Sequence, residues 1–521
     1  MTLAPPRRPE EPRRPAVASK TLAHAAVLTI AVTLAGSLLG LVRDLLLARY
    51  FGANGATDAF LVAWTVPETA FPLVVEGALA FLLVPLFSRA LAAVDPGAVD
   101  PGAADPAAAV RDLVTASAPR ILGVLVVASA TVAAGAPILV HLIAPGLADP
   151  ALAVTCTRLT ALTVLTFGLA GYLSAALRAH HVFGAPATIH LAYNTGILGL
   201  VLLLHNRFGI VSAAAGVALG SVFMVLAQVP SFVRHVGLPR RLVLRGSPVT
   251  LAAFAPIAAY TLTRQAQVFV ERHVGSALPE GTISHLNYAQ KVAQMPMLVA
   301  LLVCTVTFPT LARTVAAGQA AKARLRLESD LRTVTALIVV SAAYLLAFAP
   351  TVVGILLQHG RFTAQDTAAT ATIVRVYALG LLGQALVGVL CRPFFTAVRP
   401  GWYPAAVMAL GLTVTTALAV LGAPAFGVVA IAAANALGIS VTAVLLLAGL
   451  RRCAVAVSLS AVGSATARLA VAGAGAAAAG WLAGGLLSGA PSIVDGTVGG
   501  LVVLGTFAVL AHLTGGLRRA R

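Results

Sequence analysis

Charged residues that interrupt apolar runs are the side chains of this sequence best placed to do chemistry. The first group lies in GLVRDLLLARYFGANGATDAF, residues 40–60, and consists of Arg43, Asp44, Arg49 and Asp58. Arg43 stands within the run, where a charge costs about 2.5–3.5 kcal/mol on insertion scales, so we expect it to face a cavity. Arg49 and Asp58 fit two interpretations, a helix cap or interfacial position beside a loop, or a gating contact. Asp44 is assigned to the same gating or structural group.

Two prolines interrupt the next apolar run, WTVPETAFPLVVEGALAFLLVP at residues 64–85. Pro67 and Pro72 are expected to break a helix that also carries Glu68 and Glu76. Broken helices of this kind commonly line the substrate path of transporters. A plain kink with an interfacial glutamate is the alternative, and the sequence leaves both open.

A polar stripe interrupts a third segment, TLTRQAQVFVER. Arg264, Gln267 and Glu271 recur there at helical spacing and would share one face of a helix. A stripe of this kind is untenable against lipid, so we expect it to face the interior of the protein. Lys291, in NYAQKVAQMP, adds another interior cation.

Motifs for catalysis, metal binding and nucleotide binding are missing. The sequence contains no GxxxxGK[ST], HExxH or GxSxG pattern, and His190 and His285 stand alone. The four cysteines are far apart, in or beside apolar segments, and are interpreted as packing residues. We therefore predict no catalytic residue, no metal site and no cofactor. A TVGYG-like filter is also missing, which argues against a channel.

Membrane-spanning helices must position these residues. The chain of 521 residues is 59% hydrophobic and 10% charged, with a mean hydropathy of +0.95. That composition excludes a soluble enzyme, a secreted disulfide scaffold and a disordered chain. About fourteen apolar runs approach the length of ~20 residues that crosses a bilayer, so the predicted fold class is an all-α polytopic membrane protein. The runs centre near residues 32, 74, 130, 168, 195, 220, 260, 300, 345, 381, 411, 437, 475 and 503.

Lys and Arg positions orient these helices, since cytoplasmic loops are enriched in both. If both termini are cytoplasmic, most of the 35 Lys and Arg residues fall in inside segments. The net charge of +18 is therefore interpreted as membrane orientation, and no nucleic-acid partner is expected. Arg272 is one of the few cations that this arrangement places in an outside segment.

Buried cations around a cavity favour an anionic substrate, because fixed positive charge in a medium of low dielectric attracts anions strongly. The apolar remainder suits an amphiphile. A lipid-linked phosphate fits both features better than a hydrophilic solute does.

The segment GLVRDLLLARYFGANGATDAFLVAWTVPETAFPLVVEGALAFLLVP resembles the opening of the MurJ/MviN lipid II flippases, whose pattern runs roughly GxxRDxxxAxxFGxxxxTDAFxxAxxxPxxxxxxxxEGAxxxxFVP. Two later stretches resemble further blocks of that family, in the same order and spacing. They are NYAQKVAQMPMLVALLVCTVTFPTLAR and LLQHGRFTAQDTAATATIVRVYALGLLGQALVGVLCRPFFTAVRPGWYP.

The resemblance implies a fold of the multidrug/oligosaccharidyl-lipid/polysaccharide exporter superfamily. Two six-helix lobes would surround a central cavity, and two C-terminal helices would form a lipid-accessible groove. The implied activity is the translocation of an undecaprenyl-diphosphate-linked peptidoglycan precursor from the inner to the outer leaflet of the cell membrane, by alternating access and without covalent change. The corresponding parts are a disordered cytoplasmic tail (1–20), the N-lobe (21–235), the C-lobe (246–450) and the last two spans with a short tail (451–521).

The same resemblance assigns roles to individual residues. Arg43 occupies the position of a buried arginine that attracts the diphosphate. Lys291 stands where the family usually has an arginine, which keeps the charge but loses the bidentate fork. Asp58 and Glu76 fall on acidic positions of the motif and would serve gating or helix contacts.

This chain departs from the family pattern at two pairs of positions. Gly36 and Ser37 stand where the family typically has Ser-Arg, and Phe71 and Pro72 stand where paired arginines are common. Arg264 is expected to replace part of this missing charge from another helix. The seventh and eleventh spans contain no aspartate, so the sodium site proposed for some members is not implied here.

Two other functions remain open from the sequence. A cation-coupled exporter of another lipid-linked glycan or of a drug-like amphiphile would need a carboxylate deep in the membrane, whereas Asp44, Asp58 and Glu76 lie near the ends of spans. A non-transporting scaffold for cell-wall synthesis proteins would account for the missing arginines.

Overall fold

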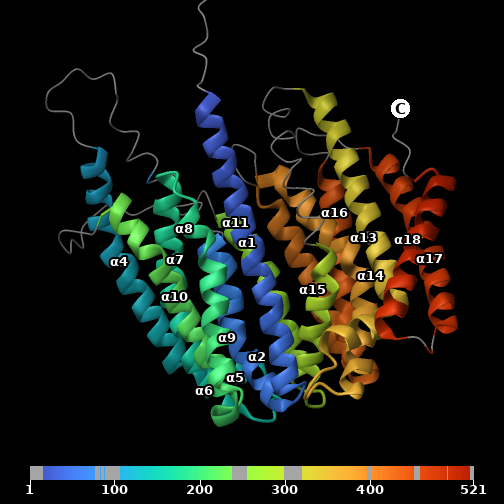
Figure 1. The fold of residues 1–521 in the computed structure, drawn as a ribbon, viewed down its shortest axis with the longest axis horizontal. Helices are drawn as coiled ribbons and strands as arrows, with labels where there is room; N and C mark the ends of the chain where they lie inside the picture. The colour runs from blue at the N-terminus through green and yellow to red at the C-terminus, as the bar shows by residue number, and fades with distance from the viewer. Residues whose placement is uncertain are drawn as a thin grey trace, which may run out of the picture.

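The computed structural model describes residues 16–76, 83, 87, 106–237, 255–297, 319–395, 401–450, 458–487, 489 and 491–516. These residues form helices and connecting turns, with no strand among them, which confirms the all-α fold class. Long helices run side by side, and the start of α1 and the end of α18 lie on the same side of the molecule (Figure 1). We call that side the terminal face and the other side the opposite face.

The helices of the first half of the chain pack around a shared apolar core that includes Phe60, Phe167 and Met224. Their bounds are α1 (Ala16–Phe51), α2 (Gly55–Phe71), the π-helical turn η1 (Pro72–Glu76), α4 (Pro106–Ala134), α5 (Ala136–Ile143), α6 (Pro150–Thr160), α7 (Leu162–Ala179), α8 (Gly184–Ala187), α9 (Ile189–Phe208) and α10 (Val211–His235).

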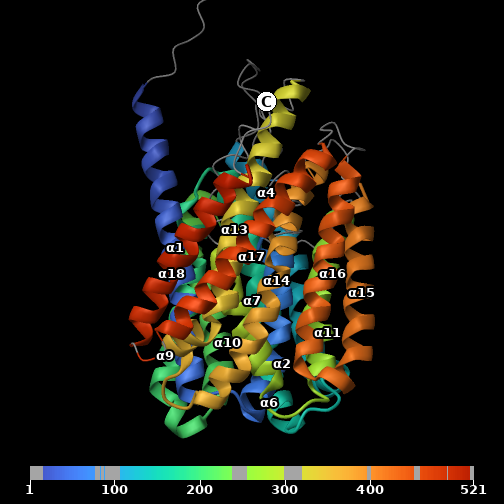
Figure 2. The ribbon, with the colours of Figure 1, turned by 90° about the vertical axis from the view of Figure 1, so that its right-hand side faces the viewer.

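The second half of the chain builds separate cores. It comprises α11 (Ala255–Gly275), helical residues 282–297, α13 (Ala320–Leu357), α14 (Ala364–Phe395), α15 (Tyr403–Phe426), α16 (Val428–Gly449), α17 (Leu459–Leu486) and α18 (Ser492–Leu513). The last two helices pack against α13 through Phe348, Leu469 and Phe507. Figure 2 shows α17 and α18 in front of α13, on the outer side of the bundle.

Twelve described helices or helix pairs are long and apolar enough to cross a membrane, which indicates an integral membrane protein. Two predicted spans, centred near residues 260 and 300, are not among the twelve. The first corresponds to α11, whose polar stripe lowers its hydropathy. The second begins with helical residues 282–297, and its remainder lies outside the described residues. The predicted count of about fourteen is therefore consistent with the structure.

Local signals in the sequence set several helix ends. Asn54 accepts hydrogen bonds from the backbone N–H groups of Ala56 (3.0 Å) and Thr57 (3.1 Å) and so caps α2. Thr363 and Asp366 form a reciprocal capping box at the start of α14. The helix α1 begins at Ala16, within the predicted tail of residues 1–20, because Ala-rich sequence continues the helix beyond the apolar run. Residues 1–15 of that tail lie outside the described residues.

Glycine allows α9 and α10 to approach closely. A Cβ atom at Gly220 of α10 would lie 2.2 Å from the carbonyl oxygen of Tyr193 on α9. Helices in membranes commonly pack through small residues in this way, since lipid gives apolar side chains little reason to associate.

Candidate functional site

Arg43 of α1 is held by three neighbours in the interior. Its Nε and Nη2 donate to Asp44 Oδ1 at 2.9 and 2.7 Å, and its Nη1 donates to Asn194 Oδ1 at 3.0 Å. The guanidinium carbon also lies 4.8 Å from the centre of the Trp64 ring, within cation–π range. The Arg43 side chain is 11% exposed. Arg43, the predicted interior cation, is thus buried, and Asp44 offsets its charge.

Asn194 of α9 fixes the orientation of that guanidinium. Its Nδ2 donates to the carbonyl oxygens of His190 (2.9 Å) and Gly36 (3.1 Å), which leaves Oδ1 directed at Arg43. The sequence analysis did not select Asn194, because burying a neutral amide in a membrane costs less free energy than burying a charge. The available signal was an amide that precedes the apolar run GILGLVLLL.

Arg43 and Lys291 line the same cavity. It is a narrow space of about 10 Å³ between α1, α2 and helical residues 282–297. The structure therefore brings together two of the three predicted substrate-binding cations. The lining residues are Arg43, Asp44, Leu47, Thr57, Phe60, Leu61, Trp64, Ile210, Asn287, Tyr288 and Lys291.

The third predicted cation, Arg264, is placed elsewhere. Its side chain is exposed on α11, beside the hydroxyl of Tyr260, and it is not among the described residues that line the cavity. Burial along the predicted polar stripe increases toward Glu271, which is 6% exposed. Glu271 accepts hydrogen bonds from Gln267 Nε2 at 3.2 Å and from Asn435 Nδ2 of α16.

Arg272 connects α11 to α2. The sequence analysis had placed this residue in an outside segment. In the structure α11 continues to Gly275, and Arg272 is only 4% exposed. Its guanidinium donates to Glu68 Oε2 at 2.5 Å and to Thr65 Oγ1. The polar run around Arg272 resembles an interfacial segment, and its partner is distant in sequence. Only the folded chain could therefore reveal this pair.

Glu68 joins this ion pair to the cavity. Its Oε1 lies 3.9 Å from Lys291 Nζ, and its backbone carbonyl accepts a hydrogen bond from Gln265 Nε2 at 2.8 Å. The Glu68 side chain is 17% exposed. The sequence identified Glu68 only as part of a proline-broken helix, whereas the structure gives it two cationic neighbours.

The proline-containing segment keeps its helical course through Pro67, and α2 ends at Phe71. The π-helical turn η1 follows from Pro72 to Glu76, which places the irregularity at the second proline. The Glu76 side chain lies outside the described parts of the chain.

Asp58 joins the two halves of the chain at the opposite face by capping a helix from the other half. Its Oδ2 accepts from Gly281 N at 2.7 Å, and its Oδ1 accepts from Ser284 N at 2.7 Å and Ser284 Oγ at 2.5 Å. The residue is 4% exposed. These bonds satisfy backbone donors at the start of helical residues 282–297.

Backbone contacts extend this closure. The carbonyl oxygen of Arg49, whose side chain is exposed, accepts from Arg361 N at 2.8 Å. Nearby, His273 Nδ1 lies 3.0 Å from the carbonyl oxygen of Leu142. The cavity lined by Arg43 and Lys291 thus lies between two halves of the chain that are joined at the opposite face.

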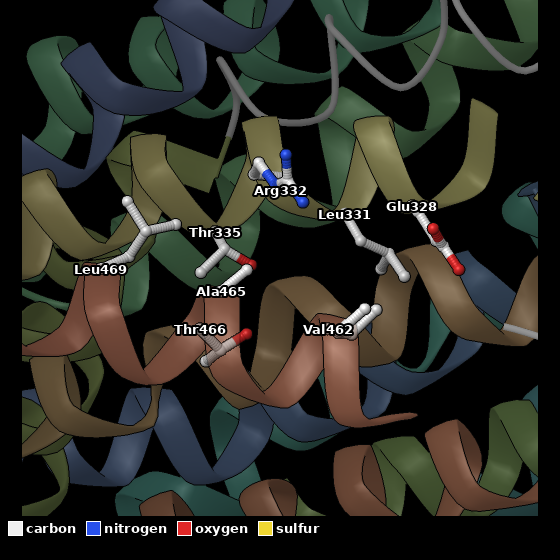
Figure 3. A pocket seen from close by; sticks show the side chains of 9 residues that line it. Glu328, Leu331, Arg332, Thr335, Val462, Ala465, Thr466 and Leu469 are labelled. Carbon is white, nitrogen blue, oxygen red and sulfur yellow. The ribbon is translucent and has the colours of Figure 1, made fainter. Parts of the chain in front are cut away.

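Two other pockets contact α13. A small one between α13 and α17 is lined by Glu328, Arg332, Thr335 and Thr466 (Figure 3). Glu328 accepts there from Arg324 Nε (2.9 Å) and Ser458 N (3.1 Å), so it stabilises the start of α17. A larger, mainly apolar groove of about 500 Å³ lies between helical residues 282–297, α13 and α18.

Comparisons with known proteins agree with this architecture. The family model described as lipid II flippase MurJ matches residues 47–494. The lipid II flippase MurJ of Burkholderia cenocepacia is 27% identical over 385 residues, which cover 71% of this chain and 72% of that protein. A probable lipid II flippase MurJ of Rhizobium meliloti is 29% identical over 425 residues, or 76% of each protein.

Solved structures share the fold. A lipid II flippase MurJ in an inward closed conformation matches with a TM-score of 0.76 at 20% identity, over 94% of this chain and 98% of that chain. An inward-facing MATE family multidrug resistance transporter matches with a TM-score of 0.64 at 14% identity, over 82% and 98%. The family model matches far more than half of the sequence, which confirms the resemblance. The chain belongs to the lipid II flippase MurJ family.

Proposed function

We propose that this protein moves lipid II, the undecaprenyl-diphosphate-linked peptidoglycan precursor, from the inner to the outer leaflet of the cell membrane. The step is transport by alternating access and makes no covalent change. The observation that supports it most strongly is the cavity shared by Arg43 and Lys291, because two fixed cations in a mostly apolar surround suit a lipid-linked diphosphate.

Arg43 is the principal diphosphate ligand in this proposal. Asp44, Asn194 and Trp64 hold its guanidinium in one orientation, so less conformational freedom is lost when the substrate binds. Lys291 supplies a second charge, 3.9 Å from Glu68 Oε1. Arg264 contributes outside this cavity, as an exposed cation on α11 that attracts the substrate before it binds.

Asp58 and Arg49 belong to the gate at the opposite face. Opening that face would require the loss of the Asp58 bonds to Gly281 and Ser284 and of the contact between Arg49 and Arg361. Pro67, which precedes the π-helical turn, and Glu76, which ends it, are proposed to let the remainder of this segment bend as the cavity changes shape.

The two halves act as lobes in this scheme, residues 21–235 and 246–450, and residues 451–521 add the last two spans. The apolar groove beside α18 would accommodate the polyprenyl chain while the diphosphate occupies the cavity. In this proposal both termini lie in the cytoplasm, and the protein contacts proteins of cell-wall synthesis at the membrane surface.

Depletion of the native lipid II flippase in a bacterial host tests the proposal. We expect this chain to restore growth and the appearance of lipid II in the outer leaflet. The Arg43→Ala variant should restore neither. Stable insertion without any outer-leaflet lipid II would instead support the scaffold alternative.

A further inference from the structure

Glu68 of α2 lies between two cations from the second half of the chain. Its Oε2 accepts a hydrogen bond from Arg272 Nη2 at 2.5 Å, whereas its Oε1 lies 3.9 Å from Lys291 Nζ. Only the first distance is within hydrogen-bond range. The carboxylate therefore makes one short contact, with Arg272, and one long contact, with Lys291.

The short contact holds the carboxylate in place. The Arg272 side chain is 5% exposed, and its guanidinium also donates to Thr65 Oγ1. The backbone carbonyl of Glu68 accepts a hydrogen bond from Gln265 Nε2 at 2.8 Å, which adds a second link between α2 and α11. Separation of Arg272 from Glu68 would leave a buried charge without its counterion, which is strongly unfavourable.

The long contact leaves Lys291 open to a ligand. Its side chain is 34% exposed and lines the cavity together with Arg43. An ammonium group has three N–H donors, and those of Lys291 form no hydrogen bond to a described residue. Glu68 Oε1 likewise accepts no hydrogen bond from the described part of the chain. Phosphate oxygens are strong acceptors and can therefore bind this ammonium group.

Entry of a diphosphate would separate Lys291 from Glu68. The space lined by Arg43 and Lys291 is narrow, about 10 Å³, so it must widen to admit two phosphate groups. One of its walls is α2, which carries Glu68 one turn beyond the lining residue Trp64, and another is formed by helical residues 282–297, which carry Lys291. Movement of these two walls apart lengthens the long contact. Repulsion between the carboxylate and the incoming anion acts in the same direction, since charges interact strongly in a medium of low dielectric.

We propose that Lys291 exchanges partners during transport. It faces Glu68 in the empty protein, and it binds a phosphate oxygen of the substrate in the loaded protein. Glu68 stays with Arg272 throughout and regains Lys291 when the diphosphate leaves, so no covalent bond changes. Glu68 is thus a positioning residue that acts through Lys291, weakens substrate binding and assists release. This inference rests on the proposed function, because the diphosphate is the anion that competes with Glu68.

Isothermal titration calorimetry of the full-length protein in nanodiscs measures the competition, with farnesyl diphosphate as the probe. The variants are Glu68→Gln, Lys291→Gln and the combination of both. The glutamine amide oxygen can still accept a hydrogen bond from Arg272. The matched control is Asp112→Asn, which removes an exposed carboxylate of α4 that has no hydrogen bond or ion pair among the described residues.

Glu68→Gln should tighten binding, because the diphosphate no longer competes for Lys291. We expect a gain of about tenfold in the wild-type background. In the Lys291→Gln background the gain should fall to about threefold or less, since only repulsion between the carboxylate and the diphosphate remains. Asp112→Asn should leave the affinity unchanged, and Lys291→Gln alone should weaken binding.

Weaker or unchanged binding by Glu68→Gln would mean that Glu68 only pairs with Arg272, and it overturns the inference. An equal gain in the two backgrounds, or an equal gain in Asp112→Asn, also overturns it, because charge alone would then account for the effect. The proposed function stands in these cases if Arg43→Ala still weakens binding. Absence of binding by the wild type overturns the proposed function and this inference together.

Nuclear magnetic resonance tests the exchange without a change at Glu68, in case Glu68→Gln does not yield folded protein. The chain contains three lysines, Lys20, Lys291 and Lys322. Reductive methylation attaches isotope-labelled methyl groups to each, and the signal that disappears in Lys291→Gln identifies Lys291. Farnesyl diphosphate should shift this signal and leave those of the other two lysines in place. An unshifted Lys291 signal at saturation overturns the inference.

Discussion

At the scale of a single residue, Arg43 is a buried charge that still lines the cavity and so can contact a ligand. Asp44 accepts two of its N–H groups through one oxygen, and Asn194 accepts a third. We expect Arg43→Ala to abolish transport while the protein still inserts and folds. Arg43→Lys should retain part of the activity, because an ammonium keeps the charge without the guanidinium fork. Flipping of a labelled lipid in proteoliposomes checks both, and normal flipping by Arg43→Ala would show that Arg43 is not the diphosphate ligand.

Asn194 should act on the substrate only through Arg43. A hydrogen bond to a charged group is worth about 1.5–3 kcal/mol, so Asn194→Leu is expected to weaken farnesyl diphosphate binding by about tenfold or more. Thr195→Ala is the matched control, since Thr195 is exposed on the same helix and, among the described residues, its hydroxyl donates to the carbonyl oxygen of Leu191. In an Arg43→Ala background the Asn194 effect should vanish, and a persisting effect would contradict a positioning role.

At the scale of elements, the turn before α14 and the end of α1 fit together at the opposite face. Gly360 has φ +63°, and a Cβ atom there would lie 2.3 Å from the Arg49 carbonyl oxygen. Gly360→Ala should therefore force α1 and this turn apart and shift the protein toward states open at the opposite face. Spin-label distances across that face, measured by double electron–electron resonance, should lengthen.

A second glycine provides a control that distinguishes the effect of this contact from the effect of backbone strain. Gly209, between α9 and α10, has φ +53° but no atom within 4 Å of an added Cβ. Gly209→Ala carries only the cost of a backbone conformation that favours glycine, about 1–3 kcal/mol. It should lower stability without changing those distances, and equal effects of the two variants would mean that contact with Arg49 does not close the face.

For the whole molecule, the proposed orientation puts the terminal face in the cytoplasm. The helix α13 projects beyond its neighbours on that face and carries Arg324, whose side chain is 47% exposed (Figure 1). In a background lacking the native cysteines, Arg324→Cys should react with a membrane-impermeant maleimide only after permeabilisation. His359→Cys, exposed at the opposite face, should react in intact cells. The reverse pattern would invert the topology.

The sequence alone determined the helical class, the approximate spans and the presence of the cations Arg43 and Lys291 within or beside apolar runs. These features are local, because an apolar run in a bilayer must satisfy its backbone hydrogen bonds within its own helix, and a charge inside such a run is visible in the sequence itself. The helix whose extent was predicted least well from the sequence was α11, because its polar residues made its end resemble a loop.

Only the tertiary structure decided the partners of these charges. Arg272 meets Glu68 across 204 sequence positions, Asp58 meets Ser284 across 226, and Arg43 meets Asn194 across 151. Arg264, which the sequence had assigned to the same cavity, is not among the described residues that line the pocket shared by Arg43 and Lys291. A polar side chain shows in sequence that it needs a partner inside a membrane, but many distant residues could meet that need. The packing of the helices selects among them, since it sets which faces lie within hydrogen-bond distance.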